Sequence, residues 1–420
     1  MFKSIFKTAT FKQSQITIVG TIINGALGAL FYIVLARFLG PSDFGILTIA
    51  LTTMVLIADI ADVGTNTGLV RFVSANLINN GDKALQFLKL SLSIKLVVWI
   101  FSSLLTYILA PFLASGIFHK TELVMPLRLV AFGVGGALLF TFATSALQAF
   151  QKYYLWSLIN IITNTLRLVL IVILAYLLML NIEISLIIYI AMPFFGFFVA
   201  LLFLPTKNFL LVKNETSLVR ELFKYNIPVA IFTIIAAFSA RLDTYMNAFL
   251  LSSREVGIYA AANQLVQIMP QLISALGLVA APKFASFQTN KQMLVYLKKF
   301  QLLVAGICLV GIISMPFLIY LIPLLFGKAY VAAVMPFIFL FIAQLIFLFS
   351  IPVHQAIIFY FGKPNIFIGV SLGHLLIIGI VGYYLISLYG VVGASLTVLI
   401  GMIFNFLYPL GWLLFNLRKK

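Results

Sequence analysis

The chain has 420 residues, of which 63% are hydrophobic and 9% are charged, and it carries a formal net charge of +17. Soluble globular domains carry about 25% charged residues, so this composition excludes a soluble protein. The cations are spread along the chain and form no basic soluble domain, so nucleic acid is not expected as a partner.

Twelve apolar stretches follow one another along the chain, each about twenty residues or longer. A helix of that length crosses a bilayer core of about 30 Å. The strands of a membrane β-barrel would be shorter and would alternate polar with apolar residues. We therefore predict an all-α polytopic membrane protein with twelve transmembrane helices, at about 14–38, 44–67, 86–110, 123–149, 154–180, 183–205, 225–250, 255–281, 300–325, 330–358, 365–388 and 390–416.

The basic residues predict the orientation, because the cytoplasmic segments of membrane proteins are enriched in Lys and Arg. With a cytoplasmic N-terminus, nineteen of the 27 basic residues fall in inner segments and only four in outer ones. The outer four are Arg37, Lys120, Arg254 and Lys328, and four more lie within spans, namely Lys95, Arg128, Arg167 and Arg241. We therefore expect a multi-pass protein with both termini in the cytoplasm.

The chain shows signs of an internal duplication. At a shift of 212 residues, the segment 36–47 (ARFLGPSDFGIL) falls on 248–259 (AFLLSSREVGIY), and 68–74 (GLVRFVS) falls on 280–286 (AAPKFAS). Each repeat holds six spans, so both halves have the same orientation. We expect an N-terminal lobe at 1–205, a cytoplasmic linker at 206–224 and a C-terminal lobe at 225–420. A pseudo-two-fold axis along the membrane normal would relate the lobes, with a cavity between them.

Polar residues inside the spans are candidates for function, because each costs free energy in a bilayer. In span 5, Asn160, Thr163, Asn164 and Arg167 follow helical spacing and share one face. Arg167 lies too deep to reach the interface easily. These residues predict the cationic wall of a hydrated cavity. Alternatively, Arg167 is structural and binds carbonyl groups or an Asp of a neighbouring helix.

Spans 7 and 8 carry further polar residues. Arg241 and Asp243 are two residues apart, so they point to nearly opposite faces and need different partners. Arg241 is a candidate contact for a diphosphate or an acidic sugar, and Asp243 is either structural or a site for a coupling ion. In span 8, Gln264, Gln267, Gln271 and Ser274 recur at helical spacing, which favours a face lined by water or sugar over simple helix–helix hydrogen bonding.

Span 2 contains two carboxylates, Asp59 and Asp62, on one helix face with Asn66. Two close carboxylates raise the pKa of one of them, so the pair is a candidate site for a coupling proton or cation. The alternative is a salt bridge to Lys95 of span 3 or to Arg71. Together, Lys95, Arg167 and Arg241 favour an anionic cargo.

The motifs of common enzymes are missing from the sequence. It contains no HExxH, no phosphate-binding P-loop and no GxSxG, so we expect neither an enzyme nor ATP hydrolysis. Transport energy would come from an ion gradient or from the cargo gradient. His354 and His374 have no third ligand at useful spacing and Cys308 stands alone, so we expect no metal and no cofactor.

Several of these segments resemble a known family. The segment 36–45, then Asp62-Val-Gly64 and Arg71, is similar to the first hairpin of polysaccharide flippases of the multidrug/oligosaccharidyl-lipid/polysaccharide (MOP) exporter superfamily. Asp243 with 256–259 (VGIY) resembles the start of their second lobe, and 389–394 (YGVVGA) resembles the turn into their last helix. The chain departs from the pattern at Ser252-Ser253, where its first half has Gly40-Pro41.

The resemblance implies a flippase that moves an undecaprenyl-diphosphate-linked oligosaccharide from the cytoplasmic to the outer leaflet of the inner (cytoplasmic) membrane. O-antigen unit translocases are the most similar group, so the pathway would be O-antigen, capsule or another surface polysaccharide. The lipid-linked cargo and the bilayer are then partners, and a polysaccharide polymerase and a chain-length regulator are candidate partners. Two alternatives stay open: a cation-coupled multidrug antiporter of the same superfamily, and a membrane polysaccharide polymerase or glycosyltransferase.

Overall fold

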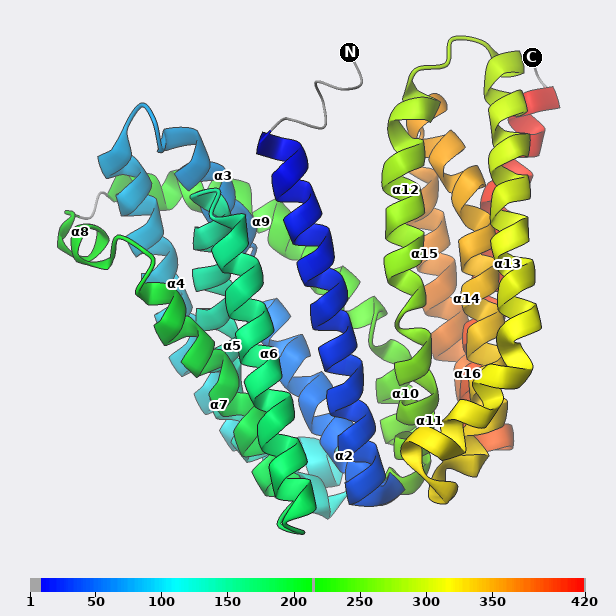
Figure 1. Cartoon of the computed structure of the whole chain (residues 1–420), viewed down its shortest axis with the longest axis horizontal. Coiled ribbons are helices and arrows are strands. Elements are labelled where there is room, and N and C mark those ends of the chain that lie inside the picture. The colour runs from blue at the N-terminus through cyan, green and yellow to red at the C-terminus, as the bar shows by residue number, and fades with distance from the viewer. Residues whose placement is uncertain (1–8, 214–215, 419–420) are drawn as a thin grey trace. The chain divides into compact units, whose positions relative to one another are not determined.

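The computed structural model describes residues 9–213 and 216–418 of the chain. These ranges are helical almost throughout and contain no β-strand, which confirms the all-α class (Figure 1). Within them, ten helical segments are long and apolar enough to cross a membrane. The predicted location of both termini in the cytoplasm involves residues 1–8 and 419–420, which lie outside the described residues, and it stays a prediction.

Two of the ten segments are too long for one crossing. Gln15–Ala61 has 47 residues and Ile366–Arg418 has 53. At 1.5 Å per residue, a straight helix of 47 residues would be about 70 Å long, more than twice the bilayer core. Each segment changes direction at a glycine with positive φ, Gly40 at 77° and Gly390 at 56°. Each therefore provides two crossings, which accounts for the twelve predicted spans.

The described residues form two compact units. Of the described residues, the first unit contains 9–39, 46–213 and 216–241, and the second contains 40–45 and 242–418. The first unit holds most of α2 (Ala9–Ala61), followed by α3 (Thr65–Asn76), α4 (Gly81–Pro111), α5 (Val124–Ala149), α6 (Tyr153–Tyr176), α7 (Ile182–Leu201), α8 (Thr206–Leu211) and α9 (Thr216–Ser239). Short π-helical and 3-10 turns, η1 (Phe112–Ile117) and η2 (Thr121–Leu123), join α4 to α5.

The core of the first unit forms around α5, which packs against α4 and α7. Buried residues of α3, α4, α5 and α9 meet there, among them Leu69, Phe87, Phe142 and Leu222. Leu222 belongs to the predicted linker 206–224. In the structure the second part of that linker begins α9, which continues without interruption into span 7. The predicted lobe boundaries stay a prediction; along the chain, the first compact unit ends at Arg241 and the second resumes at Leu242.

The second unit contains α10 (Leu242–Leu250), α11 (Ser253–Val266), α12 (Met269–Ala285), α13 (Asn290–Phe326), η3 (Lys328–Ala333), α14 (Val334–Gln355), η4 (Ala356–Tyr360), α15 (Ile366–Leu376), η5 (Ile377–Val381) and α16 (Gly382–Arg418). Its central helix is α14, which packs against α11, α12, α13 and α16. The start of α13 and the end of α16 lie at the same end of this unit (Figure 1).

A reciprocal contact joins the two matching segments of the internal repeat. A Cβ added to Gly45 would overlap the backbone of Ser253, and a Cβ added to Gly257 would overlap the backbone of Pro41. At the repeat spacing of 212 residues, Pro41 corresponds to Ser253 and Gly45 to Gly257. Glycine at both positions therefore permits the backbones of two helix starts to touch. The contact is reciprocal, because each glycine meets the first residue of the other helix start. A local two-fold relationship has this property.

We expect Gly257→Ala to destabilise the protein, because the new methyl group would meet backbone that cannot rotate away. Overpacking of this kind costs about 1–3 kcal/mol. Gly25→Ala in α2 is the matched control, since a Cβ there meets nothing within 4 Å and alanine favours a helix. Thermal unfolding of both purified variants in detergent measures the effect. An unchanged melting temperature for Gly257→Ala would contradict the close contact.

Candidate functional site

Three of the predicted spans are interrupted, and the interruptions lie at polar residues. Span 2 breaks between Ala61 and Thr65, span 7 between Ser239 and Leu242, and span 8 between Val266 and Met269. Val63 and Gly64 have positive φ values of 48° and 69° at the first break, which is an uncommon conformation for the β-branched Val63. Interrupted helices frequently form the binding sites of transporters, because their ends offer unpaired backbone groups.

Asp62 and Lys95 form a buried ion pair at the break of span 2. The Nζ atom of Lys95 lies 2.5 Å from Oδ1 of Asp62, and the Lys95 side chain has no exposed surface. Asp62 also accepts hydrogen bonds from the hydroxyl of Thr65 at 3.0 Å and from the backbone N–H of Asn66 at 3.3 Å. This carboxylate therefore neutralises a cation and caps the N-terminus of α3.

Asp59 and Arg241 form a second ion pair, at the break of span 7. The Nη2 atom of Arg241 lies 2.7 Å from Oδ2 of Asp59, and the two side chains keep 20% and 45% of their surface exposed. The Nη1 atom of Arg241 donates to the carbonyl of Ala237 at 3.0 Å, near the C-terminal end of α9. Arg241 therefore binds a helix end and a carboxylate, and the pair is partly exposed.

The two carboxylates of span 2 are thus bound to two different cations. For Asp62, the structure has the salt bridge to Lys95 that the sequence left open as an alternative. Asp59 pairs with a residue 182 positions away, which local spacing could not predict. The expectation that Arg241 and Asp243 do not pair with each other is confirmed, because Asp243 binds elsewhere. A role of Asp59 or Asp62 in ion coupling stays a prediction.

Arg167 differs from the other cations that lie deep in the spans. Its guanidinium lies over the rings of Phe31 and Tyr189, 4.4 Å and 4.7 Å from their centroids. Within the described residues it makes no ion pair with a carboxylate, and its buried Nε has no hydrogen-bond partner. The two rings stabilise the cation and hold it in place, but they do not neutralise its charge.

The other polar residues of α6 bind the first half of α2 and their own helix. Asn164 donates a hydrogen bond of 3.0 Å to Oδ1 of Asn24, while Asn160 donates to the carbonyl of Trp156 at 2.8 Å. Thr163 is buried, and its hydroxyl has no partner within the described residues. The structure therefore brings Asn164 and Arg167 together against α2, as their spacing predicts.

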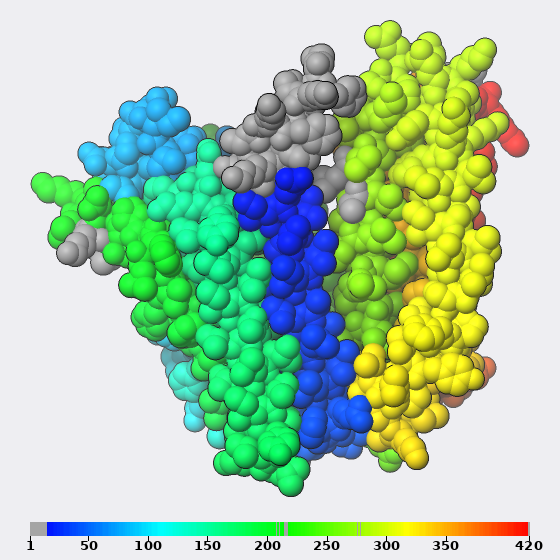
Figure 2. Space-filling model, viewed as in Figure 1, coloured from blue at the N-terminus to red at the C-terminus, as the bar shows by residue number. Residues whose placement is uncertain are grey.

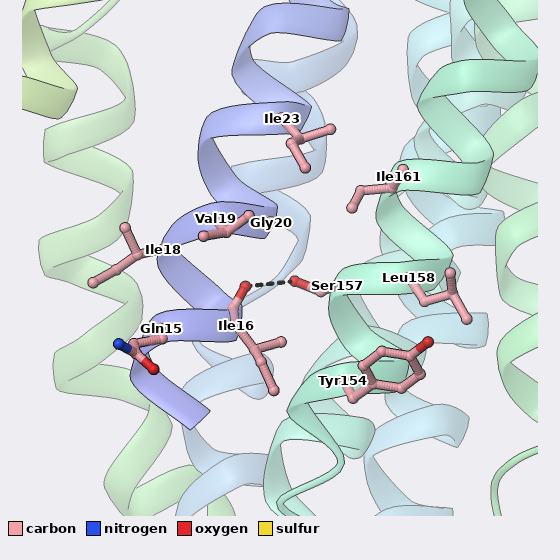
Figure 3. A pocket seen from close by; sticks show the side chains of 10 residues that line it. All are labelled: Gln15, Ile16, Ile18, Val19, Gly20, Ile23, Tyr154, Ser157, Leu158 and Ile161. Atoms are coloured by element: carbon pink, nitrogen blue, oxygen red, sulfur yellow. Dashed lines mark hydrogen bonds between the residues drawn. The ribbon is translucent and has the colours of Figure 1, made fainter. Parts of the chain in front are cut away.

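A largely apolar groove runs along the same two helices. Figure 3 shows its lining by residues of α2, from Gln15 to Ile23, and of α6, from Tyr154 to Ile161. Its volume is about 550 Å³, and the hydroxyl of Ser157 donates to the carbonyl of Ile16 at its floor. The side chains suit hydrocarbon, since a sugar would find few hydrogen-bonding partners there.

The second unit contains a buried polar cluster around Asp243. The hydroxyl of Tyr259 donates to Oδ2 of Asp243 at 2.6 Å, and the hydroxyl of Thr244 donates to Oδ1 at 3.4 Å. Asn247, one turn further along α10, is fully buried, and neither its Oδ1 nor its Nδ2 has a partner among the described residues. Nε2 of His374 is likewise buried without a partner. Buried polar atoms without partners are uncommon, which makes this cluster a candidate site for an exchangeable proton, a water or a small ion.

The glutamine series of span 8 does not lie on one continuous helix. The series crosses the break after Val266, where Pro270 begins α12, so helical spacing does not hold between Gln264 and Gln271. Gln264 is half-buried, whereas Gln267, Gln271 and Ser274 are exposed on the second unit. Exposed amides in a transmembrane segment favour contact with water over contact with lipid.

Comparison with known proteins identifies the family. The family described as "Polysaccharide biosynthesis protein" matches residues 11–288. The chain belongs to this family. Among curated proteins, no sequence matches. The fold is that of MOP superfamily transporters, because solved members match along nearly the whole chain.

An inward-facing MATE family multidrug transporter of the MOP superfamily is 13% identical, with a TM-score of 0.70, covering 96% of this chain and 99% of its own. The lipid II flippase MurJ in an inward closed conformation is 16% identical, with a TM-score of 0.72, covering 94% of this chain and 87% of its own. A MOP superfamily transporter from Pyrococcus furiosus is 13% identical, with a TM-score of 0.62 and coverages of 97% and 94%. Because the sequence identities are low, these matches establish the fold alone.

We expect Asp62→Asn to destabilise the protein strongly, because it would leave the buried Lys95 cation without a counter-charge. Breaking a buried pair by removing one partner costs roughly 3–5 kcal/mol. The double variant Asp62→Asn, Lys95→Met should recover much of that loss. The half-exposed pair of Lys83 and Glu221, at 3.1 Å, is the control, and Glu221→Gln should cost about 1 kcal/mol or less. Equal losses from Asp62→Asn and Glu221→Gln in thermal unfolding would refute the buried pair.

Proposed function

We propose that the protein is a flippase that moves a polyprenyl-diphosphate-linked oligosaccharide from the cytoplasmic to the outer leaflet of the inner membrane. Membership of the polysaccharide biosynthesis family supports a role in making a surface glycan. The similarity of its fold to the lipid II flippase and to the MATE transporters supports transport through the interior of a helical protein. O-antigen and capsule units are the cargo classes that this proposal names.

The observation that carries the proposal is the state of Arg167. Lys95 and Arg241 already have carboxylate partners, whereas Arg167 is held by two aromatic rings without a counter-charge among the described residues. An unneutralised charge inside a membrane span costs free energy, and such charges commonly bind an ion or a substrate. A diphosphate provides the missing negative charge and accepts hydrogen bonds from a guanidinium in two-pronged geometry. Lys95 is thereby withdrawn as a direct cargo contact, and Arg241 would bind cargo only in exchange for Asp59.

The exposed amides of the second unit fit the sugar part of such a cargo. Gln267, Gln271 and Ser274 offer donors and acceptors to hydroxyl groups, and Gln264 lies beside them at the helix break. Asn160 and Asn164 could contribute in the same way only if they gave up their present hydrogen bonds. We therefore place the sugar contacts mainly on span 8.

Ion coupling is the proposed energy source, with alternating access of two lobes as the mechanism. Asp243 is its best-placed residue, since Asn247 and His374 around it have unpaired buried atoms. A polysaccharide polymerase and a chain-length regulator would be partners on the outer side. A multidrug antiporter is the second candidate, and its cationic drugs would favour an unpaired carboxylate where this protein has the unpaired Arg167.

We expect Arg167→Ala to abolish export of the lipid-linked glycan without loss of protein from the membrane, while Arg167→Lys restores part of it. The reason is that a diphosphate crossing a low-dielectric interior requires a fixed cation. Arg241→Ala should also abolish export, because it would leave the Asp59 carboxylate without its cation, and that negative charge would repel an anionic cargo. Surface glycan in cells that express each variant at equal levels provides the measurement.

Arg128→Ala is the matched control for Arg167. Arg128 also lies over an aromatic ring, that of Tyr107 at 5.0 Å, and its buried Nε also has no partner in the described residues. It lies near the start of α5, where an interfacial anchor is expected. Export should therefore survive its loss. Normal export by both Arg167→Ala and Arg241→Ala would refute an electrostatic role for the two residues.

We expect transport in vesicles to depend on an ion gradient and on a carboxylate inside the spans. Asp243→Asn should slow transport as much as collapsing the pH or sodium gradient, and the two effects should not add. Asp59→Asn and Asp62→Asn test the other two candidates, and Glu183→Gln, exposed at the start of α7, is the control. If all three Asn variants transport normally and neither gradient changes the rate, the protein is a facilitator driven by cargo consumption.

A further inference from the structure

The C-terminal part of the chain has an unusual charge composition. Residues 256–420 contain no Asp or Glu. They contain nine basic residues: Lys283, Lys291, Lys298, Lys299, Lys328, Lys363, Arg418, Lys419 and Lys420. No carboxylate side chain from this part of the chain can therefore neutralise them. In the described residues, Lys291, Lys298 and Lys299 make no ion pair with any part of the protein.

These three lysines lie where α13 extends beyond the bilayer core. The helix has 37 residues and is therefore about 55 Å long, compared with a core of about 30 Å. All its charges fall within 290–299, while 300–326 is uncharged and long enough to cross. We therefore expect the segment 290–299 to lie at the level of the lipid head groups. Figure 2 shows α13, in yellow, on the surface of the second unit along its length.

A pocket of about 390 Å³ opens on this segment. It is lined by Phe287, Lys291, Gln292, Val295, Tyr296 and Lys299. Aromatic rings form its wall, since the ring of Tyr296 lies 5.4 Å from that of Phe287 and 5.1 Å from that of Phe284. Lys283 adds a further cation, with its Nζ 5.6 Å from the centroid of Phe287.

The fold adds positive potential from the backbone. The segment starts α13, with Thr289 as its cap, so the positive end of the helix dipole points to the same region. The hydroxyl of Tyr360 donates to Oδ1 of Asn290 at 2.6 Å and so holds the turn that carries Lys363 at this end of the unit. Lysines, aromatic rings and a helix N-terminus are thus combined beside an exposed apolar side chain, Val295, which keeps 50% of its surface.

We infer that this pocket, defined by Phe287, Lys291, Tyr296 and Lys299, binds the head group of an anionic phospholipid of the surrounding leaflet. The phosphodiester lies between Lys291 and Lys299, and Tyr296 and Phe287 pack against the glycerol and the first carbons of the acyl chains. Each lysine near a membrane surface contributes about 1 kcal/mol of attraction to anionic lipid. This inference goes beyond the proposed function and holds whatever the cargo is.

An anionic phospholipid fits the pocket better than a soluble anion. Val295 is exposed beside the lysines, so a ligand that offers apolar chains together with negative charge matches this surface. Interfacial aromatic and basic residues are arranged in this way where proteins anchor at lipid head groups. The site would fix the height of α13 in the bilayer.

Native mass spectrometry of the full chain tests the inference. The purified protein is mixed with phosphatidylglycerol or with phosphatidylcholine of the same acyl chains, and the bound lipid is counted. We expect the wild type to retain several-fold more phosphatidylglycerol. The variant Lys291→Gln, Lys298→Gln, Lys299→Gln should lose that preference, and Tyr296→Ala should weaken it.

The matched control removes three basic residues of the first unit: Lys83→Gln, Lys89→Gln and Lys213→Gln. Lys83 and Lys89 already have partners, Glu221 and the carbonyl of Val212. The control should keep the preference for phosphatidylglycerol. A wild type without this preference, or an α13 variant that keeps it, would overturn the inference. So would a preference for a polyprenyl diphosphate over phosphatidylglycerol that the same three substitutions abolish, since the ligand would then be the cargo.

Discussion

A charge or an unpaired backbone group inside a bilayer must find a partner. In this protein, charged side chains bind the unpaired backbone groups at helix breaks and also pair with each other. Where span 2 stops, Asp62 receives the backbone N–H of Asn66 and the buried ammonium of Lys95. Where span 7 stops, Arg241 donates to the carbonyl of Ala237 and to Asp59. The helix breaks are therefore stabilised by charges that would otherwise be costly, and the charges are held by the breaks.

Arg167 is the exception to this arrangement, and the functional proposal depends on it. Two rings, from α2 and α7, hold its guanidinium, and Asn164 of its own helix α6 donates a hydrogen bond to Asn24 of α2. The surroundings are aromatic and partly polar, and they leave the positive charge without a counter-charge among the described residues. Because the chain belongs to the polysaccharide biosynthesis family, a lipid diphosphate is the anion that we propose for this position.

The number and placement of the spans could be predicted from the sequence, because the bilayer thickness imposes a minimum length of apolar helix. The face shared by Asn164 and Arg167 could be predicted from helical spacing, because span 5 is an uninterrupted helix. The helix breaks could not be predicted from hydropathy. Because one break lies between Gln264 and Gln271, the prediction that these two residues share one helix face was wrong. Pro270 and the segment Asp62-Val-Gly64 were the local signals that marked two of the three breaks.

The ion partners could not be predicted, because they join residues far apart in the chain. Asp59 and Arg241 are 182 residues apart, and Asp62 and Lys95 are 33 apart. Spacing within one helix showed only that Arg241 and Asp243 need separate partners. Whether a deep cation such as Arg167 meets a carboxylate or an aromatic ring depends on the packing of α2, α6 and α7, which spacing within one helix does not show.

The most direct test of the central claim measures which charge the cargo must carry. Purified protein in vesicles would be given fluorescent polyprenyl-linked glycans that differ only in the linker, a diphosphate or an uncharged group of similar size. The account predicts rapid translocation of the diphosphate form, slow translocation of the uncharged form, and a rate for Arg167→Ala that is slow for both. Equal rates for the two cargoes in the wild type would contradict it.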